Sequence, residues 1–158
     1  MTQTLYLLRH AKSEPWTPGI NDFQRTLSER GRTHMSRLSA WIGEHLPKPE
    51  EILCSSATRT RQTLEGIESA WPDAAAVTRY VDEIYEASTG TLHALAEQAF
   101  LRANSLLMVG HNPGFEYLFS AVTRDEDMQS IYKMPTGALA VIEFENGYRD
   151  DAGQGRLK

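Results

Sequence analysis

Cysteine is scarce in the 158-residue sequence, where Cys54 is the single example. One cysteine cannot form an intramolecular disulfide, so the composition is typical of a protein from a reducing compartment. Long apolar runs are missing too, and none approaches the roughly 20 residues of a membrane-spanning helix. The first residues do not combine a basic stretch with a long apolar one. We therefore expect no signal peptide and a cytoplasmic protein.

An excess of basic residues is also missing, because the formal net charge is -5. This charge argues against nucleic acid or an anionic membrane as a partner, since both attract a basic face. It leaves room for one small anion bound by a local group of arginines. The length predicts one domain spanning residues 1–158, and the polar tail over residues 150–158 is expected to fray.

Three catalytic classes lack their sequence pattern. The chain has no G-x-x-x-x-G-K-[ST] phosphate loop, and its five histidines are scattered rather than set at zinc-ligand spacing. We therefore expect no metal. A cysteine phosphatase would need an arginine at the sixth position after its nucleophile. That position after Cys54 is Thr60, and Arg59 comes one residue early. Cys54 is better interpreted as a buried strand residue.

Short apolar runs alternate with segments of helical spacing along the chain. The apolar runs predict strands at residues 5–8, 51–54, 77–81, 106–109 and 138–144. Apolar residues at helical spacing between them predict four helices, the first capped by Ser28. This alternation predicts an α/β fold, with a mostly parallel central sheet of about five to six strands and helices on both faces.

Polar residues gather directly after the predicted strands. Successive strands are followed by Arg9 and His10, by Ser55, Ser56 and Arg59, by Glu83 and Glu86, and by the segment 110–114, Gly-His-Asn-Pro-Gly. In open α/β sheets, ligands bind at the carboxyl ends of the strands. We therefore expect two arginines, two histidines and a carboxylate to meet at one edge of the sheet.

The chemistry of these side chains favours a phosphate site. The arginine guanidinium has planar N–H donors that match phosphate oxygens, and a histidine can attack phosphorus or carry a proton. Each residue alone has a simpler interpretation. Arg9 could form a surface ion pair, His111 could be a turn residue, and Arg59 could lie on a solvated helix face. Their combination favours function.

Three stretches resemble the motifs of the histidine phosphatase, or phosphoglycerate-mutase-like, superfamily. They are "LLRHAKS", "SSATRTRQT" and "GHNPG", and they occur in the family's order. The form R-H-A-K-S, the stretch "NDFQRTLSERGR" and the segment "IYEAS" are similar to the SixA-type branch of small phosphohistidine phosphatases. The resemblance implies a phosphoglycerate-mutase-like fold and a phosphatase that uses neither metal nor another cofactor.

The resemblance also implies roles for individual residues. His10 would be the nucleophile that becomes phosphorylated, while Arg9, Arg59 and His111 would bind the phosphoryl oxygens. Larger branches of the family carry a general acid after the third strand, and Glu86 is the nearest match here, with Glu83 as the alternative.

The stretch "NDFQRTL" places Asp22 and Arg25 near the mouth of the expected site. We interpret this pair as an ion pair that fixes the loop, rather than as catalytic residues.

Three functions stay open at this point. The first is dephosphorylation of phosphohistidine on a protein, and the second is hydrolysis of small phosphate esters. The third is a non-enzymatic module that binds phosphohistidine or phosphopeptides, which would need the arginines but no nucleophile. The presence of His10 favours an enzyme. The expected partner is thus a phosphorylated protein or a small phosphorylated metabolite.

Overall fold

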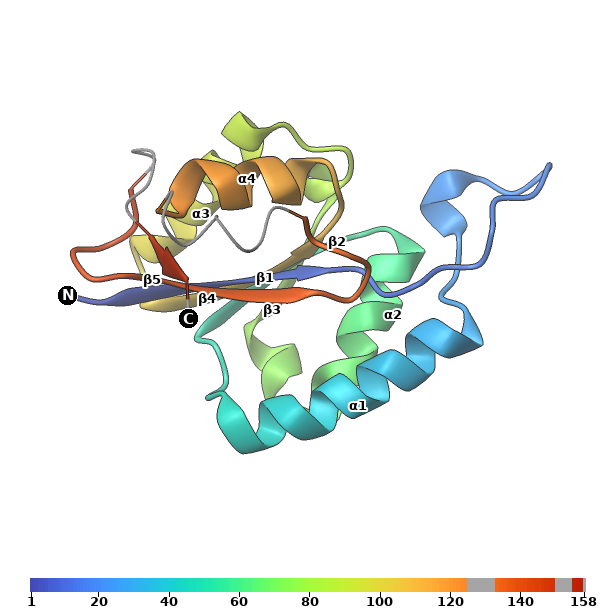
Figure 1. Cartoon of the computed structure of the whole chain (residues 1–158), viewed down its shortest axis with the longest axis horizontal. Helices are drawn as coiled ribbons and strands as arrows, with labels where there is room; N and C mark the ends of the chain where they lie inside the picture. The colour runs from blue at the N-terminus through green and yellow to red at the C-terminus, as the bar shows by residue number, and fades with distance from the viewer. Residues whose placement is uncertain (125–132, 150–154, 158) are drawn as a thin grey trace.

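A six-stranded mixed sheet forms the centre of the molecule (Figure 1). The computed structural model describes residues 1–124, 133–149 and 155–157. The strands are β1 (Gln3–Arg9), β2 (Glu51–Ser55), β3 (Thr78–Val81), β4 (Ser105–Gly110), β5 (Leu139–Phe144) and β6 (Arg156–Leu157). Their order in the sheet is β3-β2-β4-β1-β5-β6. The pairs β2–β3, β2–β4 and β1–β4 are parallel, and the pairs β1–β5 and β5–β6 are antiparallel. The predicted α/β class with a mostly parallel sheet is confirmed.

Helices cover both faces of this sheet. They are α1 (Glu29–His45), α2 (Thr58–Ile67), α3 (Thr89–Phe100) and α4 (Gly114–Val122), with short 3-10 helices η1 (Asp22–Gln24), η2 (Glu68–Ala70), η3 (Ala74–Val77) and η4 (Asp82–Ile84) between them. Helices α1 and α2 lie on one face, and α3 and α4 lie on the other (Figure 1). The predicted cap is confirmed, because the Ser28 hydroxyl accepts the Gly31 N–H at 3.1 Å.

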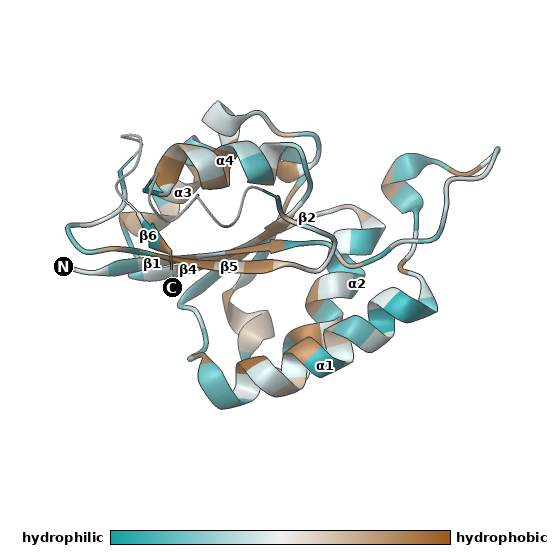
Figure 2. Ribbon diagram, viewed as in Figure 1, coloured by the Kyte–Doolittle hydropathy of each residue, from teal (hydrophilic) through white to brown (hydrophobic). Residues whose placement is uncertain are grey.

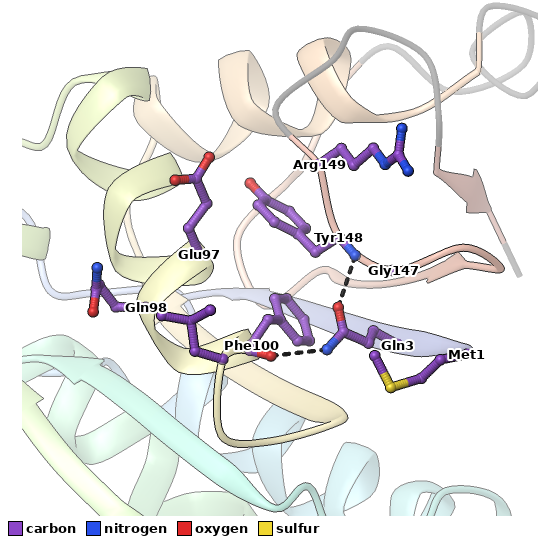
Figure 3. A pocket seen from close by; sticks show the side chains of 9 residues that line it. Met1, Gln3, Glu97, Gln98, Phe100, Gly147, Tyr148 and Arg149 are labelled. Atoms are coloured by element: carbon purple, nitrogen blue, oxygen red, sulfur yellow. Dashed lines mark hydrogen bonds between the residues drawn. The ribbon is translucent and has the colours of Figure 1, made fainter.

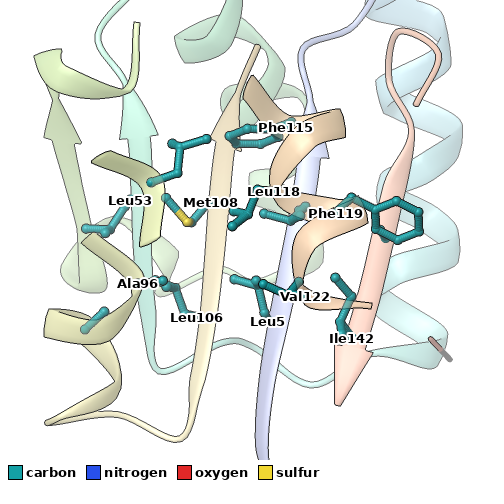
Figure 4. Close-up of a cluster of buried hydrophobic side chains, with 14 of the residues drawn as sticks. Leu5, Leu53, Ala96, Leu106, Met108, Phe115, Leu118, Phe119, Val122 and Ile142 are labelled. Atoms are coloured by element: carbon teal, nitrogen blue, oxygen red, sulfur yellow. The ribbon is translucent and has the colours of Figure 1, made fainter. Parts of the chain in front are cut away.

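The hydrophobic core has two halves, one on each face, because side chains of a strand alternate between faces. In β1, Leu5 and Leu7 pack toward α3 and α4, whereas Tyr6 and Leu8 pack toward α1 and α2. Figure 4 shows strand and α4 side chains meeting in the first half. Figure 2 accordingly shows hydrophobic stretches in the strands of the sheet and in the helices that lie against it.

The register of the central strands determines where the side chains of the candidate site lie. Arg9 in β1 is paired with Gly110 in β4, and Cys54 in β2 is paired with Val109. His10, Ser55 and His111 therefore follow at the same carboxyl edge. This is the edge at which parallel sheets bind ligands.

The end of the chain differs in part from its expected frayed state. Arg156 and Leu157 pair with β5 as β6, whereas residues 150–154 and 158 lie outside the described residues. A strand of two residues has no periodicity that a sequence pattern could reveal. Among the helices of the described ranges, none is long and apolar enough to cross a membrane.

Leu107 offers a test of this core, since it lies in the central strand β4 and is fully buried between the sheet and the α1–α2 layer. We expect Leu107→Ala to lower the free energy of unfolding by about 2–5 kcal/mol, through lost apolar burial and the cavity left behind. Urea denaturation followed by circular dichroism measures this change. The matched control is Leu101→Ala, because Leu101 is 80% exposed. Equal effects of the two substitutions would contradict the assigned core.

Candidate active site

Arg9 ends β1 and turns its guanidinium into the carboxyl edge of the sheet. Its Nη1 donates to the carbonyl oxygen of Met134 at 2.9 Å. Its Nε is buried and has no partner among the described residues. Burial is the main cause that lowers the pKa of Arg9, although this guanidinium stays charged. A buried donor without a partner is costly, so this one favours an incoming anion.

His10 is fixed with one ring nitrogen toward the protein. Its Nδ1 lies 2.8 Å from the carbonyl oxygen of Ala11, which can only accept, so Nδ1 carries the proton. In the neutral ring, Nε2 then keeps its lone pair. Burial and, secondarily, Arg59 and Arg9 lower the pKa of His10 to about 4, against the bond to Ala11. Burial is the larger of these causes.

His111 lies beside His10, with 5.5 Å between the ring centroids. It follows β4, is 7% exposed, and has its Nε2 at 2.8 Å from the Ser55 hydroxyl. Its Nδ1 is buried and lacks a partner within the described part of the chain. Burial, followed by Arg59, lowers the pKa of His111 to about 3, so this ring is neutral at physiological pH.

Arg59 reaches the same site from the first turn of α2. It is 7% exposed, and Asp22 binds two of its guanidinium nitrogens, because Nη1 donates to the Asp22 backbone carbonyl at 2.8 Å and Nη2 to Asp22 Oδ2 at 3.2 Å. The guanidinium also lies 5.8 Å from the centre of the Tyr85 ring. Asp22 therefore holds a cation that the protein would otherwise bury alone.

Asp22 has a larger role than the sequence suggested. The expected ion pair with Arg25 is confirmed at 3.0 Å, but the carboxylate also accepts the Tyr85 hydroxyl at 2.6 Å and pairs with Arg59. These donors, Tyr85 first, lower the pKa of Asp22 to about 2. The sequence predicted only the ion pair with the neighbouring Arg25, and it gave no indication of the contacts with Tyr85 and Arg59. The stretch "NDFQRTL" was the only sequence feature that pointed to Asp22.

A cavity of about 340 Å³ opens beside Arg59 and His111. Its remaining lining residues are Asp22, Tyr85, Glu86, Ala87, Asn112, Pro113 and Gly114. Glu86 is thus near the site, as its place after β3 suggested, and it is exposed and held at a φ of 56°. Glu83 is exposed and is not among the residues that line this cavity.

The glycines on either side of His111 serve packing. A Cβ on Gly110 would lie 2.5 Å from the Phe115 ring, and one on Gly114 would lie 2.7 Å from the Ala87 carbonyl oxygen. Both distances are shorter than van der Waals contact. The two glycines let the turn carrying His111 fit against α4 and the start of α3.

Met134 and Glu116, which the sequence did not predict as part of the site, also stabilise this edge of the sheet. The Met134 carbonyl accepts both Arg9 Nη1 and Asn112 Nδ2, the latter at 3.0 Å. The Met134 amide donates to Glu116 Oε1 at 2.9 Å. Met134 acts through its backbone, so its residue type gave no signal.

Cys54 is buried in β2 as expected, and burial raises the pKa of its thiol to about 12.

A larger cavity of about 500 Å³ lies at the other end of β1 (Figure 3). Gln3 lines it and is fully engaged, donating to the Phe100 carbonyl at 2.9 Å and accepting the Tyr148 N–H at 2.7 Å. None of the four predicted phosphate-binding residues lines this cavity. Its size therefore does not make it the better candidate.

Solved structures of phosphoglycerate-mutase-like proteins share this fold, in which the two histidines and two arginines lie at the carboxyl edge of the sheet. A model of the histidine phosphatase superfamily, branch 1, matches residues 5–113. The chain therefore belongs to this superfamily, and within it to the SixA type. Family and structural likeness together support phosphatase activity.

Three similar proteins illustrate the range of this superfamily. The uncharacterized protein Rv1276c of Mycobacterium tuberculosis is 31% identical over 151 residues, which cover 90% of each chain. A crystal structure from Agrobacterium tumefaciens, assigned as the phosphohistidine phosphatase SixA, has a TM-score of 0.82 at 30% identity, covering 99% of this chain and 95% of its own. Mycobacterial glucosyl-3-phosphoglycerate phosphatase Rv2419c has a TM-score of 0.70 at 13% identity, covering 100% and 98%, and this likeness concerns the fold alone.

The Asp22 carboxylate makes stability depend on pH. Its folded pKa lies below the ordinary value of 3.8, so its contribution is present above that pH and is lost as the pH falls toward about 2. We expect wild type to exceed Asp22→Asn in free energy of unfolding by about 1 kcal/mol at pH 7, a small value because Asp22 is 42% exposed. Urea denaturation between pH 7 and pH 2.5 measures the difference, with exposed Asp73→Asn as control. A difference that stays constant with pH would contradict the assignment.

Proposed function

We propose that the protein is a phosphatase that works without metal through phosphorylated His10, and that its substrate is phosphohistidine on a protein. The observation that carries this proposal is the state of the His10 ring. Its proton is held on Nδ1 by the Ala11 carbonyl, its ring lies beside that of His111, and Arg59 and Arg9 are close enough to lower its pKa. A neutral nucleophile beside fixed cations is suited to attack on a phosphoryl group.

In the first step, the Nε2 lone pair of His10 forms a bond to phosphorus. The bond to the leaving group breaks, and its electron pair goes to the leaving atom. Negative charge spreads over the three equatorial oxygens in the transition state. Arg9 and Arg59 supply their other guanidinium N–H donors to those oxygens, since each guanidinium is already held by a bond from Nη1 to a backbone carbonyl before the substrate binds.

In the second step, water attacks the phosphorylated ring. A new P–O bond forms, the P–N bond to His10 breaks, and its electron pair returns to Nε2. The products are inorganic phosphate and the neutral ring of the starting enzyme. The arginines stabilise the same charge in both steps, so one pocket serves the whole cycle.

The choice between protein and small-molecule substrates depends on the leaving group. A phosphohistidine nitrogen can be protonated near neutral pH before the P–N bond breaks, whereas an alkoxide is strongly basic and gains from an enzymatic acid. The likeness to SixA favours phosphohistidine on a protein. Hydrolysis of small phosphate esters is the second candidate, because Glu86 lines the cavity beside Arg59 and His111.

His10→Ala should abolish turnover while leaving the circular dichroism spectrum unchanged, since a covalent route has no substitute nucleophile. Wild type quenched during turnover of a phosphohistidine peptide should carry acid-labile, base-stable phosphate, located on His10 by mass spectrometry. Added EDTA should leave the rate unchanged. Retained turnover in His10→Ala, with no phosphoprotein in wild type, would refute the covalent mechanism. Tight binding of the peptide without turnover in wild type would instead indicate a binding module.

Glu86→Gln should slow hydrolysis of an alkyl phosphate by about 10²–10⁴-fold and hydrolysis of a phosphohistidine peptide far less, because the ester needs a proton donor. The measurement is kcat/KM for both substrates in both proteins. Glu83→Gln is the matched control, since Glu83 is exposed and outside the cavity. A large, equal loss on both substrates would promote the ester function. No loss on either would remove Glu86 from the site.

A further inference from the structure

We propose that Ser55 is a positioning residue that fixes the tautomer of His111, so that His111 Nδ1 carries a hydrogen toward the bound phosphoryl group. The proposal concerns the phosphate pocket and rests on the proposed function for its catalytic meaning. It assigns to a buried hydroxyl the task of making a neutral histidine into a donor.

Ser55 is held rigidly at the carboxyl end of β2. The residue is fully buried, and its own carbonyl accepts hydrogen bonds from Thr60 Oγ1 at 2.8 Å and Cys54 Sγ at 3.3 Å. Its hydroxyl oxygen accepts the Ala57 N–H at 3.3 Å and lies 2.8 Å from His111 Nε2. The hydroxyl therefore has two partners. One of them, the Ala57 backbone N–H, can only donate.

A count of hydrogens decides the direction of the contact between Ser55 and His111. With Ala57 donating, the Ser55 hydroxyl can give its proton to His111 Nε2 and satisfy both groups. If His111 Nε2 donated instead, the Ser55 proton would have no acceptor in the described part of the chain. His111 Nδ1 would then be a buried acceptor without a donor. The first arrangement leaves one unmet group, and the second leaves two.

In the first arrangement, the group without a partner is the Nδ1–H of His111, which can donate a hydrogen bond to a phosphoryl oxygen. His111 is neutral, because burial and then Arg59 disfavour its cation, so the ring has one hydrogen to place. Ser55 occupies Nε2 as a donor, and the hydrogen belongs on Nδ1. This N–H and the Nε–H of Arg9 are then two buried donors without a partner in the described part of the chain, and both are suited to bind an anion.

The two histidines then share one tautomer but present opposite groups to the substrate. In His10, the Nδ1–H is turned to the Ala11 carbonyl and the Nε2 lone pair is free. In His111, the Nε2 lone pair is turned to Ser55 and the Nδ1–H is free. The carbonyl beside His10 leaves that ring a lone pair for attack, whereas the hydroxyl beside His111 leaves that ring an N–H to donate.

The direct test uses the unmodified protein. Wild type labelled with ¹⁵N-histidine is studied by long-range ¹H–¹⁵N NMR at pH 7, with His111 assigned through His111→Gln. We expect Nδ1 of His111 in the range of a protonated nitrogen and Nε2 in the range of an unprotonated, hydrogen-bonded one. The Nδ1 signal should shift when inorganic phosphate is added. A proton on Nε2 would overturn the proposal.

A variant pair tests the consequence for binding. Ser55→Ala removes the hydroxyl, so the His111 signals should move toward the Nε2–H tautomer, and the Kd for inorganic phosphate should rise about tenfold, as for a lost hydrogen bond to a charged group. Ser39→Ala is the matched control, because Ser39 is also buried and bonds Ser69 at 2.8 Å in the α1–α2 layer. Unchanged His111 signals or unchanged phosphate affinity in folded Ser55→Ala would overturn the proposal.

These readouts require no turnover. If the protein hydrolysed neither phosphohistidine nor esters, the proposed function would fail, yet the tautomer and the phosphate affinity would still be measurable. If turnover through His10 were established but His111 carried its proton on Nε2, only the role of Ser55 would fail.

Discussion

The parallel pairing of β1 with β4 is the constraint on which the site depends. Register places Arg9 opposite Gly110, and the His10 N–H donates to the Gly110 carbonyl at 3.0 Å. His111 follows directly, so two residues about a hundred positions apart in sequence become neighbours. The backbone bonds of the sheet, rather than contacts between the functional side chains, bring them together. The side chains can therefore remain partly unsatisfied and available for a ligand.

Burial is the second condition of the site. It keeps both histidines neutral beside two arginines, since it disfavours any further positive charge. The same burial would make Arg59 costly, and Asp22 offsets this cost with a carboxylate and a backbone carbonyl. Neutral imidazoles and a fixed cation thus arise from one desolvated environment, in which the buried Arg59 cation has Asp22 as its partner.

Sequence patterns predicted the sheet and the edge at which the polar residues meet, because strand periodicity and the rule for carboxyl ends are local or topological. The same patterns could not identify Met134, which contributes a carbonyl that any residue has. They also missed the contact of Asp22 with Tyr85, which joins segments 63 positions apart. β6 escaped notice because two residues carry no periodicity. What the sequence could not give is the set of hydrogen bonds between loops, which depends on how the loops fold over the finished sheet.

The hydrogen bonds of the 133–137 segment have a consequence for dissecting the chain. The family match ends at residue 113 and includes Arg9, His10, Arg59 and His111, yet Met134 holds Arg9, and the Gly137 N–H donates to the His10 carbonyl at 2.9 Å. β5 also forms one side of β1's pairing. A fragment cut after the last motif would therefore contain the candidate catalytic residues without the segments that hold them in place. A circular permutant opened in an exposed loop would keep both the candidate residues and the 133–137 segment with β5. It is therefore the better way to relocate the termini.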